Sequence, residues 1–187
     1  MAVQPQERVY TPEDLWELAH SAEDRFFELI EGAIIEMPPP GDKHGAVVAW
    51  LGALMVMHVE RHDLGDVTME TGFILKPDTV CSPDIGFVAK ARLTTPMTGR
   101  YYPFAPDLAI EVISPSDAPG PVRRKVALYL RSGTRAVWVV YPDERFVDVY
   151  HANGTVSTYE GGDTIDGGDT LPGFSVAVQD VFKRVRD

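Results

Sequence analysis

The stretch that decides the fold is Asp107-Leu108-Ala109-Ile110-Glu111-Val112-Ile113, an apolar run that opens on one acid and holds a second inside it. Near-continuous apolar runs of this length are typical of central strands that are covered on both faces. A carboxylate inside such a strand is costly unless it is paired or binds a metal ion. We therefore expect Glu111 to form either a buried salt bridge or part of a metal site.

An acid and a lysine flank this strand along the chain. Upstream, Ser82-Pro83-Asp84-Ile85 places Asp84 at the start of another apolar run. Downstream, apolar residues recur with helical spacing at Val122, Val126, Tyr129 and Leu130. Lys125 lies at the edge of this helical face, so we expect its side chain to lean toward the sheet.

Each of these residues alone has an ordinary explanation. Asp84 suits a turn after a proline, Lys125 can extend along apolar surface into water, and Glu111 can be half of a salt bridge. Together, the order acid, acid, lysine on strand, strand, helix favours a functional site. Carboxylates on neighbouring strands can share a Mg²⁺ ion, which polarises a phosphate and lowers the pKa of a bound water. A nearby ammonium orients that water or stabilises developing charge.

The middle of the chain reads helix, strand, strand, strand, helix, strand, which predicts an α/β fold with a mixed sheet flanked by helices. We expect these elements at residues 43–62, 66–76 with a break near Gly72, 84–88, 107–113, 121–132 and 136–141. Around this αβββαβ core we expect an N-terminal helix, a β-hairpin turning at Glu31-Gly32, and a C-terminal β extension that begins with a hairpin across Asn153-Gly154. No linker divides the chain, so residues 1–187 are expected to form a single domain.

The helix expected over residues 43–62 has no polar face between Ala46 and Val59. A helix that is apolar all round is usually buried on both sides. We expect one side to pack on the sheet and the other to pack against the N-terminal hairpin. A second subunit is the alternative cover, which leaves a homodimer open.

The charge balance of the chain restricts the kinds of partner. The 28 acids and 17 bases give a net charge of -11, which argues against a large basic face for nucleic acid. A nucleic-acid enzyme remains compatible, because local acids can hold a metal. The single cysteine, Cys81, excludes an internal disulfide and fits a reducing compartment. The polar N-terminus and the shortness of the apolar stretch from Ala46 to Val59 lead us to expect a cytoplasmic protein without a membrane span.

A series of motifs, in their order along the chain, carries a resemblance to a known family. The motifs are Phe27-Glu28-Leu29-Ile30-Glu31-Gly32, Met37-Pro38-Pro39-Pro40 with His44, Ser82-Pro83-Asp84, residues 106–116, Lys125-Val126-Ala127-Leu128-Tyr129, Trp138-Val139-Val140-Tyr141-Pro142 and Leu171-Pro172-Gly173-Phe174. On these motifs, nearly the whole chain resembles the bacterial Uma-type family of restriction endonucleases, once catalogued as a domain of unknown function, within the PD-(D/E)XK nuclease superfamily. The resemblance implies a restriction-endonuclease-like core.

The resemblance also implies roles for particular residues. Asp84 and Glu111 would bind the metal, and the carbonyl of Val112 would add a ligand. The general pattern of the superfamily has a lysine two residues after the second acid, where this chain has Ile113. Lys125 matches a lysine that the family has moved onto the following helix.

The implied function is that of a metal-dependent endonuclease that hydrolyses nucleic-acid phosphodiester bonds, in DNA more than in RNA, with Mg²⁺ or Mn²⁺ as cofactor. Glu28 would be a further catalytic acid that reaches the site from the hairpin, and an exposed strand residue is the alternative. His44 has two interpretations as well, as a helix-start or core histidine or as a residue near the substrate.

Two other functions stay open at this stage. The acidic charge and the scarcity of clustered bases fit a non-catalytic module that binds nucleic acid or protein and keeps the nuclease fold. The all-apolar helix fits a nuclease subunit that acts only within a larger complex. Tyr101, Tyr102 and Phe104, in the loop before residue 107, are candidates for stacking on bases.

Overall fold

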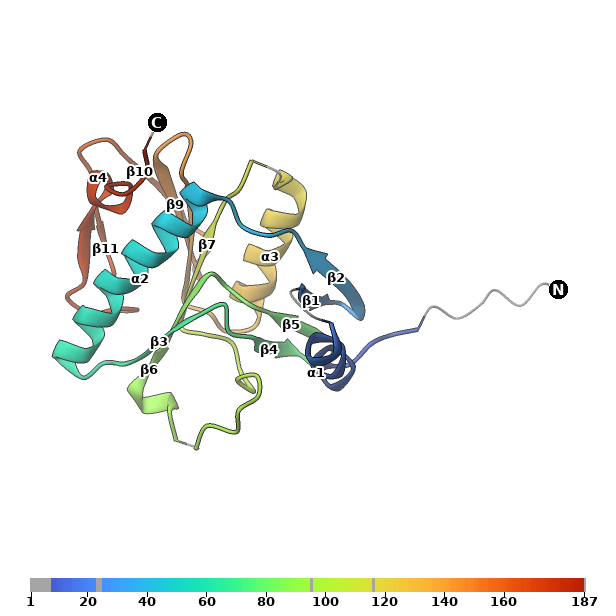
Figure 1. The fold of residues 1–187 in the computed structure, drawn as a ribbon. Helices are drawn as coiled ribbons and strands as arrows, with labels where there is room; N and C mark the ends of the chain where they lie inside the picture. The colour runs from blue at the N-terminus through green and yellow to red at the C-terminus, as the bar shows by residue number, and fades with distance from the viewer. Residues whose placement is uncertain (1–7, 23–24, 95, 116, 187) are drawn as a thin grey trace.

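A six-stranded mixed sheet lies at the centre of the protein in a computed structural model that describes residues 8–22, 25–94, 96–115 and 117–186 (Figure 1). Its strand order is β10-β9-β8-β7-β6-β3, with β7 and β8 parallel and the other neighbours antiparallel. The strands are β3 Gly65–Met69, β6 Ile85–Ala89, β7 Leu108–Val112, β8 Ala136–Tyr141, β9 Phe146–His151 and β10 Val156–Glu160. The α/β class with a mixed sheet, predicted from the sequence, is confirmed.

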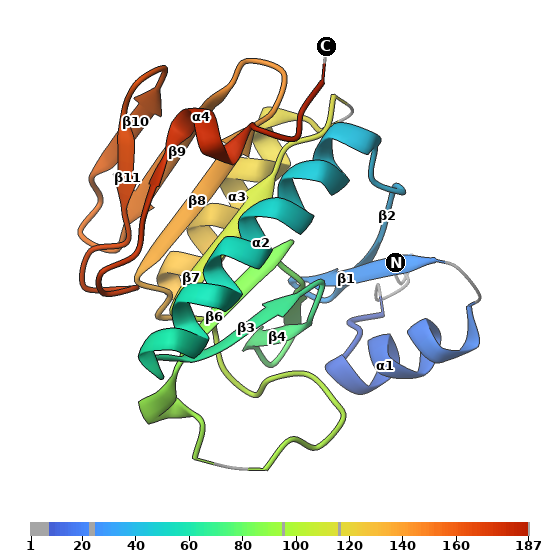
Figure 2. The ribbon, with the colours of Figure 1, turned by 60° about the vertical axis from the view of Figure 1, so that its left-hand side comes forward.

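Two helices cover opposite faces of this sheet (Figure 2). α2, Asp42–His62, packs on one face, and α3, Pro119–Arg131, packs on the other. Side chains alternate between the two faces along a strand. In β7, Ile110 accordingly packs in the core under α2, and Ala109 packs in the core under α3. This alternation turns Glu111 toward α3.

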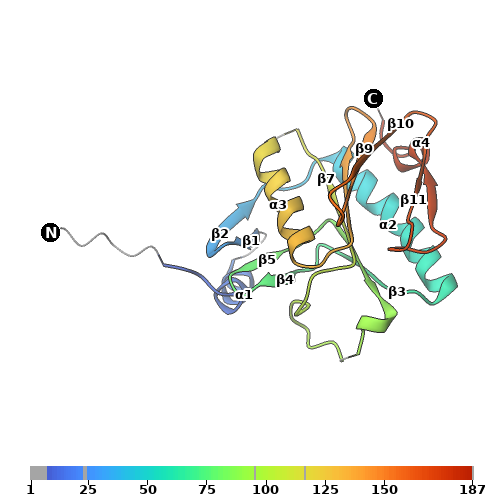
Figure 3. The ribbon, with the colours of Figure 1, turned by 180° about the vertical axis from the view of Figure 1, so that it is seen from behind.

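A four-stranded antiparallel sheet, in the order β2-β1-β5-β4, forms a second layer, and its β1–β2 hairpin lies beside α3 (Figure 3). Its strands are β1 Phe26–Ile30, β2 Ala33–Met37, β4 Phe73–Lys76 and β5 Thr79–Cys81. The hairpin turns where the sequence predicted, at Glu31 and Gly32, both of which have positive φ as its two-residue turn requires. The short helix α1, Pro12–Ser21, begins with a capping box between Thr11 and Asp14.

The break that the sequence predicted near Gly72 is confirmed, since residues 70–72 separate two strands, but the expectation that both parts form one strand was wrong. Its first part is β3, at the edge of the six-stranded sheet, and its second part is β4, in the four-stranded sheet. The chain turns between the two parts at Glu70, which has a φ of 49°. β5, which the sequence pattern did not reveal, pairs with β4. Strand pairing decides which sheet a segment joins, and the pattern within one segment does not contain its partner.

The second side of α2 is covered by the C-terminal segment and not, as the sequence suggested, by the N-terminal hairpin. This segment consists of β11 Thr164–Asp166, β12 Ser175–Ala177 and the one-turn helix α4 Val178–Val181. Phe174 and Val181 share the core cluster of α2, and the indole N–H of Trp50 donates to the carbonyl of Asp180 at 2.9 Å. The hairpin lies elsewhere because its backbone is paired within the four-stranded sheet.

Candidate active site

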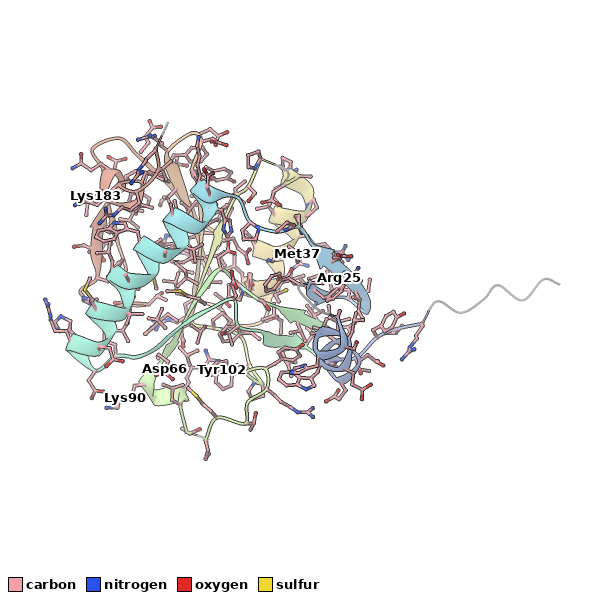
Figure 4. All side chains as sticks on the ribbon, viewed as in Figure 1. Arg25, Met37, Asp66, Lys90, Tyr102 and Lys183 are labelled. Carbon is pink, nitrogen blue, oxygen red and sulfur yellow. The ribbon has the colours of Figure 1, made fainter. Side chains whose placement is uncertain are left out.

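One pocket, with a volume of about 190 Å³, lies between the β1–β2 hairpin, the end of β7 and the start of α3. Asp84, Glu111, Lys125 and Glu28, the four residues that the sequence analysis expected to be catalytic, all line it. Met37, labelled in Figure 4, lies on the hairpin side of the pocket. The fold therefore gathers these four side chains from four separate segments into one place, while their roles remain predictions.

Glu111 and Lys125 form the centre of the pocket. The ammonium Nζ of Lys125 donates to Oε2 of Glu111 at 2.8 Å. The lysine lies on α3 between the apolar residues Val122 and Val126, and its side chain is 14% exposed. The prediction that Lys125 leans toward the sheet is thus confirmed, and the alternative of a lysine that extends into water is wrong.

Glu28 is a buried member of the same cluster and not an exposed strand residue. It is 3% exposed, and its Oε1 lies 3.0 Å from Nζ of Lys125. The same oxygen accepts a hydrogen bond from the backbone N–H of Ser82 at 2.8 Å. Through Glu28, the four-stranded sheet is tied both to α3 and to the segment that carries Asp84.

Asp84 precedes β6 and is held on both of its carboxylate oxygens. Oδ2 accepts a hydrogen bond from the backbone N–H of Val112 at 2.6 Å. Oδ1 lies 3.1 Å from Nε2 of His44, in the first turn of α2. Asp84 is therefore more than a turn residue after Pro83, because it bridges β7 and α2 at the pocket wall.

The charges of the cluster are unbalanced. Burial raises the pKa of Glu111 to about 7, with Asp84 and Glu28 adding to the rise and Lys125 opposing it. Burial acts to lower the pKa of Lys125, but the nearby Glu111 and Glu28 outweigh it and hold that pKa well above its usual value. The lysine therefore stays cationic, and five carboxyl groups line the pocket with it, those of Glu28, Glu70, Asp84, Glu111 and Asp117. Such an excess of acidic groups favours a bound cation.

Tyr129 is a site residue that the sequence analysis missed. Its hydroxyl donates to Oε1 of Glu111 at 2.9 Å, and its side chain is fully buried. Its helical spacing with Val122 and Val126 indicated only a place in the apolar face of α3. Two features of the sequence indicate a polar role for Tyr129. A buried tyrosine hydroxyl usually needs a hydrogen-bond partner, and Tyr129 lies one helical turn after Lys125.

The aromatic loop residues lie away from this pocket. Tyr102 stacks on Phe73 with ring centroids 4.9 Å apart, and Tyr101 packs edge-on against Trp16. Phe104 lies under the guanidinium of Arg92. None of the three loop aromatics lines the pocket in the described residues, and base stacking by them stays a prediction. Ser116, part of the motif quoted above, lies outside the described residues.

The donor set of the pocket suits a hard divalent cation. In the described ranges, no three His, Cys, Asp or Glu side chains are grouped as a ready-made metal site. Mg²⁺ does not require such a group, because it keeps several waters and often binds through one or two carboxylates. Asp84 and Glu111 supply two carboxylates beside the backbone of Val112. The three residues fit the cation chemically, and metal binding by them remains a prediction.

Comparison with protein families matches residues 12–179 to Uma2, described as "Putative restriction endonuclease". The chain belongs to the Uma2 family. The resemblance stated from the sequence is thereby confirmed over the greater part of the chain. A solved structure with the same fold is that of "a putative nuclease belonging to DUF820 from Anabaena variabilis ATCC 29413". It is 23% identical in sequence, with a TM-score of 0.81, and the match covers 93% of this chain and 98% of that one.

None of the curated proteins with which the chain was compared matches its sequence. Within the described residues, every helix is too short or too polar to cross a membrane.

Proposed function

We propose that this Uma2 protein is a divalent-metal-dependent endonuclease that hydrolyses phosphodiester bonds, with DNA as the preferred substrate. Membership of a family described as restriction endonucleases supports a hydrolase of phosphodiester bonds. The observation that carries the proposal is the convergence of Asp84, Glu111, Lys125 and Glu28 in one pocket. Buried acidic side chains that surround a lysine and have perturbed pKa values are more common at functional sites than elsewhere.

In this proposal, Asp84 and Glu111 hold Mg²⁺ or Mn²⁺, with the carbonyl of Val112 as a further ligand. The bound ion would polarise the phosphate and lower the pKa of a coordinated water. The chain contributes the fixed positions of the two carboxylates. Asp84 is fixed by the backbone N–H of Val112, and Glu111 by the donors of Lys125 and Tyr129.

Lys125 acts as a donor in this scheme and not as a base. Two carboxylates keep its ammonium charged, and a charged ammonium has no lone pair with which to take a proton. It has three N–H groups, of which Glu111 and Glu28 engage two in the described structure. The third can orient the attacking water or stabilise charge on a phosphate oxygen. Glu28 supports the site by holding the lysine in place.

A second function is favoured by one observation, a binding module that keeps the fold without catalysis. Every side-chain oxygen of Asp84 and Glu111 already has a protein donor within 3.1 Å, from Val112, His44, Lys125 or Tyr129. The cluster is therefore internally satisfied. A carboxylate oxygen has more than one lone pair, however, so these contacts leave room for a metal.

The deciding experiment is cleavage of plasmid DNA, single-stranded DNA and RNA by the purified full chain, with Mg²⁺, Mn²⁺, Ca²⁺ or a chelator. We expect cleavage with Mg²⁺ or Mn²⁺, most strongly of DNA, and none with Asp84→Asn or Glu111→Gln. Asp66→Asn is the matched control, a half-buried acid outside the pocket. Equal cleavage by wild type and both pocket variants would reject the proposal. Binding of nucleic acid without cleavage under every metal condition would favour the binding module.

We also propose that residues 1–187 act as one domain of a cytoplasmic protein. We further propose that this protein forms a homodimer through α2. Val56 and Met57 of α2 are 37% and 54% exposed, and they motivate the dimer. Light scattering of wild type and of Met57→Glu tests it. A wild-type protein that is monomeric at all accessible concentrations would contradict the dimer.

A further inference from the structure

His44 reaches the proposed metal-binding pocket from the opposite side of the sheet to Lys125. It lies in the first turn of α2, and its Nε2 is 3.1 Å from Oδ1 of Asp84. An ionised carboxylate can only accept hydrogen bonds, so Nε2 carries the hydrogen in this contact. The residue is 9% exposed, and it lines the pocket wall.

The other ring nitrogen of His44 indicates that the residue is not there for packing. Nδ1 is buried, and no hydrogen-bond partner among the described residues reaches it. A buried nitrogen without a partner destabilises the folded state, so an apolar side chain of similar volume would fill this position at lower cost. What the histidine adds over such a side chain is the N–H that it directs at Asp84.

The effect of this contact falls on the geometry of Asp84. His44 engages Oδ1, and the backbone N–H of Val112 engages Oδ2 at 2.6 Å. Two donors on different oxygens, from two different elements, fix the rotation of the carboxylate and therefore the direction of its remaining lone pairs. We propose that His44 is a positioning residue that orients Asp84 for metal binding, an inference that rests on the metal-dependent function proposed above. Donors that orient metal-binding carboxylates and histidines change metal affinity by about 10- to 100-fold when removed.

Three substitutions separate positioning from packing. In His44→Gln, the amide nitrogen lies as many bonds from the backbone as Nε2, so the donor to Asp84 is kept. In His44→Asn, the amide nitrogen takes the place of Nδ1 and does not reach Asp84. His44→Leu fills the volume without a donor. The measurement is Mn²⁺ affinity by isothermal titration calorimetry on the full chain without nucleic acid, with the melting temperature of each variant as the folding control.

The expected result is a rescue pattern. His44→Gln binds Mn²⁺ about as tightly as wild type, whereas His44→Asn and His44→Leu bind it about 10- to 100-fold more weakly. In cleavage assays at fixed Mn²⁺, kcat falls in the same two variants while KM for the nucleic acid stays unchanged, because His44 acts through Asp84 and not on the substrate.

Several outcomes would overturn the positioning role: equal Mn²⁺ affinity in all four proteins, an equal loss in His44→Gln and His44→Leu, or no Mn²⁺ binding by wild type. If His44→Leu does not fold, the comparison of Gln with Asn carries the test. Failure of the nuclease proposal can be distinguished from failure of the positioning role. A wild type that binds Mn²⁺ in this His44-dependent way and cleaves nothing would reject the nuclease and support the inference. Normal cleavage and normal Mn²⁺ binding by His44→Leu would support the nuclease and reject the positioning role of His44.

Discussion

The ammonium of Lys125 on α3 lies 2.8 Å from Oε2 of Glu111 on β7, so the helix supplies the cation that pairs with this strand carboxylate. The connection between the parallel strands β7 and β8 explains how a lysine on α3 reaches Glu111. The chain leaves β7, crosses over the sheet as α3 and returns as β8, which brings α3 back over the face to which Glu111 points. In the superfamily pattern that the sequence resembles, the lysine would stand at the position of Ile113, and Lys125 approaches the same carboxylate from the helix.

Removal of the lysine should abolish cleavage and weaken the fold. Lys125→Met keeps an unbranched side chain one atom shorter but leaves Glu111 and Glu28 without their cation, and breaking a buried ion pair on one side destabilises a protein by about 3 kcal/mol. Urea unfolding of the metal-free protein measures the loss. The double variant Lys125→Met/Glu111→Gln should regain part of it, since the glutamine is neutral. Additive losses in the double variant would show that the two side chains are not energetically coupled.

The hydroxyl of Tyr129 should stabilise the protein through Glu111. Tyr129→Phe keeps the ring in the core under α3 and removes the donor at 2.9 Å, and a hydrogen bond to a charged group contributes about 1.5–3 kcal/mol. We therefore expect a loss of about 2 kcal/mol in the free energy of unfolding. Tyr150→Phe, on β9 and outside the pocket, is the control and should change stability little. Equal effects of the two substitutions would argue against a specific role for the Glu111 contact.

Two glycines should respond to alanine in opposite directions. Gly65 has a φ of 146°, and a Cβ there would lie 2.0 Å from the carbonyl oxygen of Val88. Gly65→Ala should therefore destabilise the protein by about 1–3 kcal/mol or more. Gly45 lies within α2 with nothing within 4 Å of its added Cβ, so Gly45→Ala should stabilise it by about 0.5–1 kcal/mol. Thermal unfolding of both variants is the test, and changes of the same sign would contradict the described backbone.

The sequence was sufficient for the elements whose pattern is local. The apolar run around Glu111 predicted β7, and the spacing of Val122, Val126 and Tyr129 predicted the buried face of α3 and the direction of Lys125. Both predictions work because side-chain direction follows directly from the helical and strand periods.

The sequence was not sufficient where a contact joins distant segments. The C-terminal segment covers α2, and β3 and β4 belong to different sheets. Both facts depend on contacts between distant parts of the chain, which the pattern within one segment does not predict. Within the site, the contacts of Tyr129 with Glu111 and of His44 with Asp84 were missed for the same reason. Each of these side chains has an ordinary apolar or capping explanation in its own helix, and its polar partner lies on another element.

Cys81 should resist alkylation in the folded protein. It is fully buried in β5. Burial raises the pKa of its thiol well above the usual value, and the negative charge of Glu28 adds to the rise. The thiolate is the reactive form, so raising the pH to about 9 should barely accelerate labelling by iodoacetamide in the native state. Labelling should become fast once denaturant unfolds the chain. A native rate that equals the rate of a free thiol would show that β5 opens readily.

Divalent metal should stabilise the protein through Asp84 and Glu111. A ligand that binds only the folded state adds about 2.7 kcal/mol at 100 times its Kd, which raises the melting temperature of a chain of this size by about 5–10 °C. We expect Mn²⁺ to produce this shift in wild type and in Asp66→Asn, and a chelator to reverse it. Asp84→Asn and Glu111→Gln should show little of it, because each removes a charged ligand from the pocket. A full shift in both variants would mean that Mn²⁺ binds elsewhere on this acidic protein, since its net charge of -11 attracts cations without a specific site.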